Sequence, residues 1–142
     1  MVKRSIKVVF DTNVWISFLI GKRLSSILQP ISDGRIVMVV TEQLLTEIKL
    51  VTLRDKLSKY FPKESVKELI NLLETIAENV EVKSENTICR DPKDNFLFDL
   101  ISQAHADYLV TGDKDLLAHN PFKSTEIVKP AEFDRILRSQ WQ

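Results

Sequence analysis

Short apolar runs, rich in valine and isoleucine, recur along the chain and are separated by segments with helical spacing. The first run covers residues 6–10 and stops at the polar residues Asp11, Thr12 and Asn13. The later runs cover residues 36–40, 80–82, 108–111 and 125–128. Runs that are mostly continuous rather than strictly alternating are typical of strands buried on both faces of a parallel sheet. The pattern therefore predicts such a sheet.

The segments between these runs carry apolar residues near helical spacing. Helices are predicted over residues 14–20 and 24–31, from the N-cap Thr41 to about Leu57, from Pro62 to about residue 77, from Asp94 to near His105, and from Pro130 onward. Because strands alternate with helices and the chain has only three glycines, the predicted fold class is α/β, with helices flanking the sheet.

The composition is that of one globular domain. The chain has 142 residues, 44% of them hydrophobic, and we expect a single domain over residues 1–142. One cysteine, Cys89, and two histidines, His105 and His119, exclude a disulfide scaffold and leave too few ligands for a usual structural zinc site. No apolar run approaches the roughly 18–20 residues that span a membrane, and no signal peptide is recognisable. We expect a soluble, cytoplasmic protein.

The charge balance gives no direct sign of a nucleic-acid partner. Basic residues (lysine and arginine) and acidic residues (aspartate and glutamate) number 20 each, so the formal net charge is zero. Binding to phosphates is driven by clustered basic residues, which a balanced composition does not reveal. If several acids gather in one site, however, the rest of the surface is basic by difference. The position of the acids therefore decides the question.

Acidic residues follow the predicted strands at the end where ligands bind in α/β sheets. Asp11 follows the first strand, and Asp113 and Asp115 follow the fourth. Asp94 starts a helix where the chain can return to the same edge. Glu47 lies about one and a half turns into the helix after the second strand, within reach of that edge. We expect these four segments to converge.

Converging carboxylates indicate a metal site. They repel one another by roughly 4 kcal/mol per pair at about 4 Å and an effective dielectric constant near 20, unless a cation lies among them. An all-oxygen ligand set without a His or Cys cluster selects Mg²⁺ or Mn²⁺. Such a site suits phosphodiester hydrolysis, because the metal lowers the pKa of bound water and screens charge on phosphorus. The expected substrate is a nucleic acid.

Four short motifs together resemble a PIN domain. They are Val9-Phe10-Asp11-Thr12-Asn13, Glu47 in the helix after the second strand, Asp94-Asn95, and Val110-Thr111-Gly112-Asp113-Lys114-Asp115. The resemblance covers nearly the whole chain and implies a three-layer α/β/α sandwich and a metal-dependent endoribonuclease. It is greatest to the prokaryotic branch that includes VapC-like toxins of toxin–antitoxin pairs. The partners expected on this basis are an RNA substrate, an antitoxin protein and, in a homodimer, a second copy of the chain.

The same resemblance assigns roles to individual residues. Four acids would carry catalysis and ligate Mg²⁺ or Mn²⁺: Asp11, Glu47, Asp94 and Asp113. Asp115 also matches an acidic position of the family, so either it or Asp113 is the fourth ligand, with Asp113 slightly favoured because it lies closer to the strand end. Asn13 and Thr111 would orient carboxylates or water, and Asp99 is a weaker supporting candidate.

Two sets of basic residues are candidates for contacts with phosphate. Lys114 and Arg90 lie near the acids in the sequence. A wider rim that guides RNA would comprise Lys3, Arg4, Lys7, Lys22, Arg23, Lys49, Arg54 and Lys56. Basic residues on solvated faces are the ordinary interpretation of such a pattern.

Each candidate also has a structural interpretation. Aspartate after a strand commonly caps the next helix, glutamate in a helix is usually solvated, and Asp113 can be a turn residue. Asp91 is expected in a turn, His105 at a helix end and His119 in a loop. Three residues after the first strand are expected in the core, with a dimer surface as the alternative: Trp15, Phe18 and Leu19.

Two other functions compete with a nuclease. In a phosphatase of the haloacid dehalogenase type, an Asp after the first strand is the nucleophile and a second acid two residues later is the acid/base; here that position is Asn13. A catalytically silent PIN-like module that binds RNA or protein is the second alternative. The intact acids argue against it, because their mutual repulsion destabilises a fold that binds no metal. Metal binding would separate the silent module from a nuclease.

Overall fold

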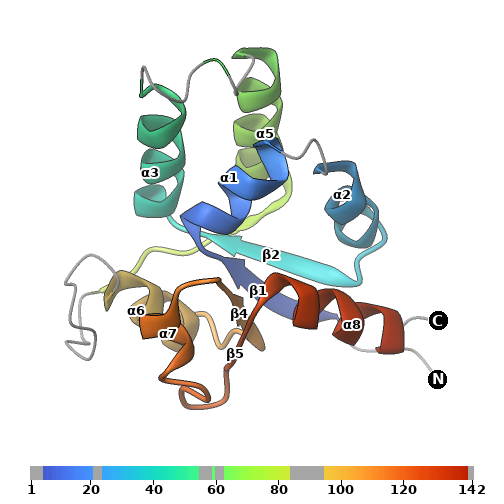
Figure 1. Cartoon of the computed structure of the whole chain (residues 1–142), viewed down its shortest axis with the longest axis vertical. Helices are drawn as coiled ribbons and strands as arrows, with labels where there is room; N and C mark the ends of the chain where they lie inside the picture. Colours follow the sequence, from blue (N-terminus) through green and yellow to red (C-terminus); the bar gives the residue numbers. More distant parts are fainter. Residues whose placement is uncertain (1–4, 21–23, 55–58, 60–62, 84–94, 141–142) are drawn as a thin grey trace.

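The computed structural model describes residues 5–20, 24–54, 59, 63–83 and 95–140. Within these ranges the chain forms a sheet of five parallel strands in the order β3-β2-β1-β4-β5 (Figure 1). The strands are β1 (Ile6–Phe10), β2 (Ile36–Val40), β3 (Glu78–Asn79), β4 (Tyr108–Val110) and β5 (Glu126–Val128). The predicted parallel sheet is confirmed.

The third strand lies two residues earlier than predicted. We expected it over residues 80–82, whereas β3 begins at Glu78, almost directly after the preceding helix. The amide of Val80 still donates to the carbonyl oxygen of Val40 at 2.9 Å, and the pairing with β2 ends there. Val80 and Val82 are half-buried and pack against a core cluster, so their apolar character reflects the packing of a loop rather than a strand.

Seven helices lie within the described ranges. They are α1 (Thr12–Ile20), α2 (Leu24–Ser32), α3 (Glu42–Thr52), α5 (Lys63–Ile76), α6 (Asn95–Gln103), α7 (Lys114–Leu117) and α8 (Pro130–Gln140). Thr41 caps α3 as predicted, since its Oγ1 accepts the amide of Leu44 at 3.0 Å. The C-cap of α3 is Leu53, four residues before the predicted end. None of the described helices has the length and apolar character needed to cross a lipid bilayer.

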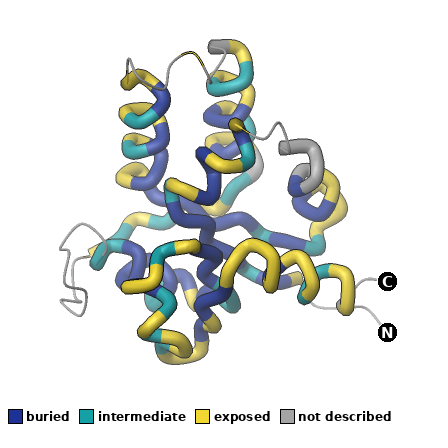
Figure 2. Tube along the Cα trace, viewed as in Figure 1, coloured by how far each residue is buried: buried dark blue, intermediate teal, exposed yellow. Residues whose placement is uncertain are grey.

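Alternate residues of the strands belong to two cores, one on each face of the sheet. Val8 and Phe10 of β1 share a core with residues of α1, α2, α3, α5 and α8. Val9 shares the other core with residues of α6 and α7. The sheet lies between these helical layers in Figure 1, and the buried residues follow the strands in Figure 2. The fold is a three-layer α/β/α sandwich, as the resemblance implied.

The aromatic residues that follow β1 pack inside the first of these cores. Trp15 is fully buried, with its ring centroid 4.9 Å from that of Phe10. Phe10 also stacks on half-buried Phe18 at 5.6 Å, and Leu19 is buried. The core interpretation is therefore confirmed for Trp15 and Leu19, because buried side chains offer no dimer surface.

Both outer strands of the described sheet expose little free backbone. Strand β3 consists of two residues. On β5, the amides of Glu126 and Thr111 bond across the β4–β5 pair, whereas the amide of Ile127 donates to the side-chain Oδ1 of Asn120 at 2.8 Å. The side chain of Asn120 thus occupies the outer edge of this strand.

Candidate active site

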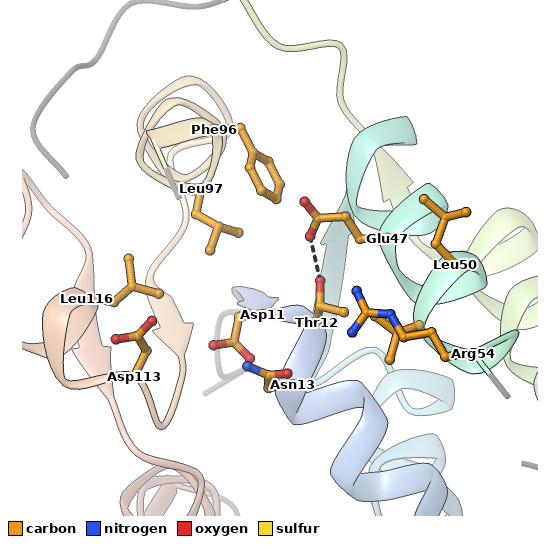
Figure 3. Close-up of a pocket in the computed structure, with 11 residues that line it drawn as sticks. Asp11, Thr12, Asn13, Glu47, Leu50, Arg54, Phe96, Leu97, Asp113 and Leu116 are labelled. Carbon is orange, nitrogen blue, oxygen red and sulfur yellow. Dashed lines mark hydrogen bonds between the residues drawn. The ribbon is translucent and has the colours of Figure 1, made fainter. Parts of the chain in front are cut away.

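A cavity of about 480 Å³ opens at the carboxyl edge of the sheet, beyond the ends of β1 and β4. Its lining comes from the start of α1, the second half of α3, the start of α6 and the region of α7 (Figure 3). Asp11, Glu47 and Asp113 line it, together with Arg54. Three of the acids singled out from the sequence, which come from different elements, therefore lie around one cavity.

Asp11 is the most buried of the three acids, with 5% of its surface exposed. It stands between β1 and α1, and its Oδ1 accepts the amide of Val14 at 2.9 Å, which caps the helix. Its Oδ2 accepts the hydroxyl of Thr111, the residue after the neighbouring strand β4. The carboxylate is therefore held from both sides, by the helix that follows it and by the adjacent strand end.

Burial raises the pKa of Asp11 above its ordinary value, because the charged form loses hydration. Hydrogen bonds from the Thr111 hydroxyl and from the amides of Val14 and Asn13 oppose this change, since they stabilise the carboxylate. The negative charge of Asp113 acts with burial and raises the pKa further. The cavity thus contains a carboxylate that a nearby cation would stabilise.

Asp113 and Asp115 differ in their relation to the cavity. Asp113 is half-buried and lines it, and its amide donates to the Oγ1 of Thr111 at 3.0 Å. The Oδ1 of Asp113 accepts the amide of Asp115 at 2.8 Å, so Asp113 is the N-cap of α7. Asp115 is exposed on α7 and does not line the cavity. Of the two acids, Asp113 is the one placed to contact a ligand there.

Glu47 is half-buried on α3 and is fixed by a residue of α1. The hydroxyl of Thr12 donates to its Oε2 at 2.8 Å, as the dashed line in Figure 3 shows. This bond joins α1 to α3 through two residues that are 35 positions apart in the sequence. Because Thr12 directly follows Asp11, the bond also sets the position of Glu47 relative to the buried acid.

The remaining acidic and polar candidates differ in whether they line the cavity. Asn13 is exposed on the first turn of α1 and lines the cavity, and Thr111 is fully buried beside Asp11. Asp99 is only 2% exposed on α6 and is not among the residues that line the cavity. Asp94, a principal candidate, lies outside the described residues.

Neither histidine belongs to the cavity. His105 is exposed just after α6, with a φ of 54° in the left-handed region. His119 follows α7, and its ring meets that of Phe98 edge-on at 5.3 Å. Their expected positions, a helix end and a loop, are therefore correct.

The basic candidates fall into four groups. Lys7 and Lys49 pair with Glu78 at 3.5 Å and Glu74 at 3.7 Å, and neither lysine lines the cavity. Lys114 is exposed on α7, also outside the lining. Several candidates lie outside the described residues: Lys3, Arg4, Lys22, Arg23, Lys56 and Arg90, as does Asp91. Arg54 is the member of the predicted rim that the structure places at the cavity.

Two functional contacts were not identified from the sequence. Thr12 was seen as part of a motif, without its bond to Glu47, and Phe96, which lines the cavity, received no role. Arg54 appeared only as one of eight rim residues. Its spacing of seven residues from Glu47, which would be two turns of the helix predicted from Thr41 to about Leu57, is the signal that links it to the acids.

The donor chemistry of the cavity fits a hard divalent cation. The described acids offer oxygen ligands alone, which Mg²⁺ and Mn²⁺ prefer. Among the residues that the structure describes, however, no three His, Cys, Asp or Glu side chains are close enough to hold one ion together. Asp11, Glu47 and Asp113 therefore fit by type and by shared cavity, and a complete ligand set needs a further donor such as Asp94 or a closer approach of these side chains.

Comparison with known proteins identifies the family. The PIN domain family matches residues 7–115 of the chain. The chain is 33% identical over 121 residues to the uncharacterized protein MJ1680 of Methanocaldococcus jannaschii, across 83% of this chain and 77% of that protein. It is also similar to the solved structure of the PIN domain endonuclease Utp24, with a TM-score of 0.49 and 17% identity over 78% of this chain and 73% of that one. Since the family match spans well over half of its length, the chain belongs to the PIN domain family.

Proposed function

We propose that this protein is a metal-dependent endoribonuclease that hydrolyses RNA phosphodiester bonds. PIN domains are typically nucleases, so membership of the family supports a nuclease-type hydrolase. The observation that carries the proposal is the presence of Asp11, Glu47 and Asp113 around one cavity at the carboxyl edge of the sheet. Ligands of α/β proteins bind at this edge.

In this proposal the three acids, together with Asp94, hold Mg²⁺ or Mn²⁺. The bound metal supplies a Lewis acid that lowers the pKa of water and screens charge on the phosphate. Thr111 and Thr12 hold Asp11 and Glu47 through the hydrogen bonds described above. Such bonds keep metal-ligating carboxylates in the orientation that binding requires.

A purely structural role explains the acids less well. Asp11 and Asp113 do cap helices, but asparagine or serine caps a helix about as well without a buried charge. Glu47 caps nothing, and Thr12 orients it at the cavity. The charge of Asp113 raises the pKa of Asp11, and this repulsion lowers the stability of the fold. A cation between the two carboxylates would restore that stability.

Cleavage of labelled RNAs tests the proposal. Single-stranded and structured RNAs are incubated with Mn²⁺, Mg²⁺ or EDTA, using the wild type, Asp94→Asn, Asp113→Asn and the control Glu64→Gln, which alters an exposed acid on α5. We expect cleavage that requires metal, is lost in both aspartate variants and persists in the control. Metal-dependent cleavage that survives both aspartate substitutions contradicts the assigned site. If the wild type neither binds metal nor cuts RNA, the protein is the silent module.

We further propose that the enzyme is the toxin of a toxin–antitoxin pair in the cytoplasm, with an antitoxin as its partner, and that it forms a homodimer. The support is the resemblance of its motifs to VapC-like toxins. Induced expression in a bacterial host tests the toxin role: growth arrest that Asp11→Asn abolishes supports it, whereas normal growth with a demonstrably active enzyme contradicts it. Light scattering of the purified protein gives its mass in solution and decides between monomer and dimer.

A further inference from the structure

Helix α3 brings a second functional group to the cavity besides Glu47. Glu47, Leu50, Val51 and Arg54 are spaced i, i+3, i+4 and i+7, which places them on one helical face, and all four line the cavity. Helix α3 ends at Thr52, but the amide of Arg54 donates to the carbonyl oxygen of Val51 at 3.3 Å and adds a tighter turn. The sequence after the helix thus keeps Arg54 on the same face as Glu47.

The guanidinium of Arg54 forms no ion pair with any carboxylate of the described residues. Glu47, on the same helical face, is bonded to Thr12 instead. Lys49, on the same helix, is paired with Glu74 and does not line the cavity. Figure 3 shows the Arg54 side chain extending from the end of α3 toward Thr12. An exposed guanidinium in this position is available to an anionic ligand, and its planar fork suits phosphate.

The acids and Arg54 lie at different levels of the cavity. Asp11 is buried at the strand end, whereas Arg54 is exposed beyond the end of α3. Helix α3 ends between Glu47 and Arg54, at Thr52, and the Arg54 side chain extends from this end toward Thr12 (Figure 3). A chain-like ligand that reaches the acids with one phosphate therefore passes Arg54 with a neighbouring part of its backbone.

The surface between these charged groups is apolar. Leu50 is 60% exposed and Phe96 is half-buried, and both line the cavity. An unpaired nucleotide can place its base or sugar against such side chains, whereas the bases of a duplex are stacked inside the helix. A volume of about 480 Å³ is that of a site for a small-molecule-sized ligand.

We propose that Arg54 forms a phosphate subsite, which binds the phosphate next to the one that is cut and selects a single-stranded segment of RNA. The inference rests on the proposed nuclease function, and it adds a residue and a strand preference to that function. It predicts a binding contribution that can be measured without any cleavage.

RNA binding is therefore measured separately. All proteins carry Asp11→Asn so that the RNA stays intact, and binding of fluorescein-labelled oligouridine is followed by anisotropy in EDTA over roughly 50–200 mM KCl. Arg54→Gln removes the charge, and Arg54→Lys keeps a charge without the planar fork. Lys49→Gln is the matched control, because it removes a charge of the same helix outside the cavity. A melting curve for each variant shows that it is folded.

We expect Arg54→Gln to weaken binding about 3- to 10-fold and to reduce the slope of log affinity against log salt by about 0.7, the loss of one phosphate contact on a single strand. Arg54→Lys should retain part of the affinity, and Lys49→Gln should bind like the parent. In the active enzyme, Arg54→Gln should raise KM with little change in kcat, because the contact is present in both ground and transition states.

Three results would overturn the inference. They are equal affinities and salt slopes for Arg54→Gln and Lys49→Gln, no binding of oligouridine by the parent, and duplex RNA that binds as tightly as the single strand. The first of these would assign the guanidinium to another ligand, such as a carboxylate of a partner protein. Cleavage by the wild type is scored independently, so the nuclease proposal can survive each of these results.

Discussion

The hydroxyl of Thr111 bonds to groups of two acidic residues at once. It donates to Oδ2 of Asp11 and accepts the amide of Asp113 at 3.0 Å. A threonine hydroxyl can donate and accept simultaneously, so this one side chain ties the end of β1 to the turn after β4. Thr111 is fully buried, which keeps water from competing for these bonds. The relative position of two proposed ligands therefore depends on a residue that carries no charge.

Asp11→Asn is expected to stabilise the metal-free protein at neutral pH. Folding raises the pKa of Asp11 through burial, so between its unfolded and folded pKa values the native state binds more protons than the unfolded state. The free energy of unfolding of the wild type then falls as pH rises through that window. Asparagine keeps an oxygen that can cap α1 and carries no charge.

Thermal denaturation in EDTA measures this difference. The melting temperature of Asp11→Asn should exceed that of the wild type at neutral pH. The advantage should shrink as pH falls toward the ordinary aspartate pKa of 3.8 and disappear below it, where Asp11 is neutral in the folded and the unfolded protein. An advantage that grows toward acidic pH would contradict the raised pKa.

Thr12→Val is expected to lower activity while the fold persists. The substitution keeps the branched shape and removes the hydroxyl that holds Oε2 of Glu47. Loss of a bond that orients a metal ligand costs about 10- to 100-fold in activity or metal affinity, and about 1 kcal/mol of stability. Cleavage rates and Mn²⁺ titration calorimetry provide the two readouts. Thr12→Ser should restore both, and equal behaviour of the valine and serine variants would refute the positioning role.

At the level of residues, the sequence predicts the acidic residues of the site better than the residues that form hydrogen bonds with them. Asp11 and Asp113 follow strands, and the rule that parallel strands end at one edge is enough to bring them near each other. The bond between Thr12 and Glu47 depends on how α1 packs against α3, which no local pattern encodes. The same packing decides that Arg54 reaches the cavity whereas Lys49 does not.

At the level of elements, α7 is a short helix that depends on its cap. Asp113 accepts the amide of Asp115 and has an extended backbone at the N-cap position. A helix of four residues has little stability of its own, so the cap and the burial of Leu116 hold it in place.

Two substitutions of Asp113 separate capping from chemistry. Asp113→Ala removes the cap and the charge, and it should lower the free energy of unfolding by about 1 kcal/mol. Asp113→Asn keeps a good cap, so its stability in EDTA should equal or exceed that of the wild type. Both variants should lose cleavage. Urea unfolding and RNA cleavage are measured in parallel, and an active Asp113→Asn enzyme would show that Asp113 only caps α7.

The elements that the sequence predicts well are those with a long pattern. The apolar runs of β1 and β2 and the helical stripes of α3 and α5 are clear patterns. Both strands have the predicted bounds and α5 differs by one residue at each end, whereas the C-cap of α3 lies four residues before the predicted end. Helix α7 is too short to show a period, and its Gly-Asp-Lys-Asp start indicates a turn. Val80 and Val82 indicated a strand because apolar residues alternate there with a polar one. The same alternation occurs where a loop packs on a core, as it does here.

At the level of the whole molecule, metal binding and stability are linked. The proposed site gathers negative charge beside a buried carboxylate, so a bound cation stabilises the native state more than the unfolded chain. Mn²⁺ at about 100 times its dissociation constant adds about 2.7 kcal/mol to the free energy of unfolding. The melting temperature of the wild type should therefore rise with Mn²⁺, and EDTA should reverse the rise.

Asp11→Asn serves as the reference for this measurement. Its melting temperature should exceed that of the wild type in EDTA, and Mn²⁺ should raise it much less. The difference between the two melting temperatures should therefore narrow or change sign with metal. An equal gain in both proteins would show that the ion binds elsewhere on the surface.

The edges of the sheet limit how the molecule can assemble. An exposed strand edge invites a strand of another chain, which leads to continuous sheets and aggregation. Here β3 offers two residues, and the side chain of Asn120 already bonds the outward amide of β5 at Ile127. We therefore expect the proposed homodimer to form through helices rather than through a continuous sheet. The bond to Asn120 makes the outward amide of Ile127 unavailable to a strand of another chain.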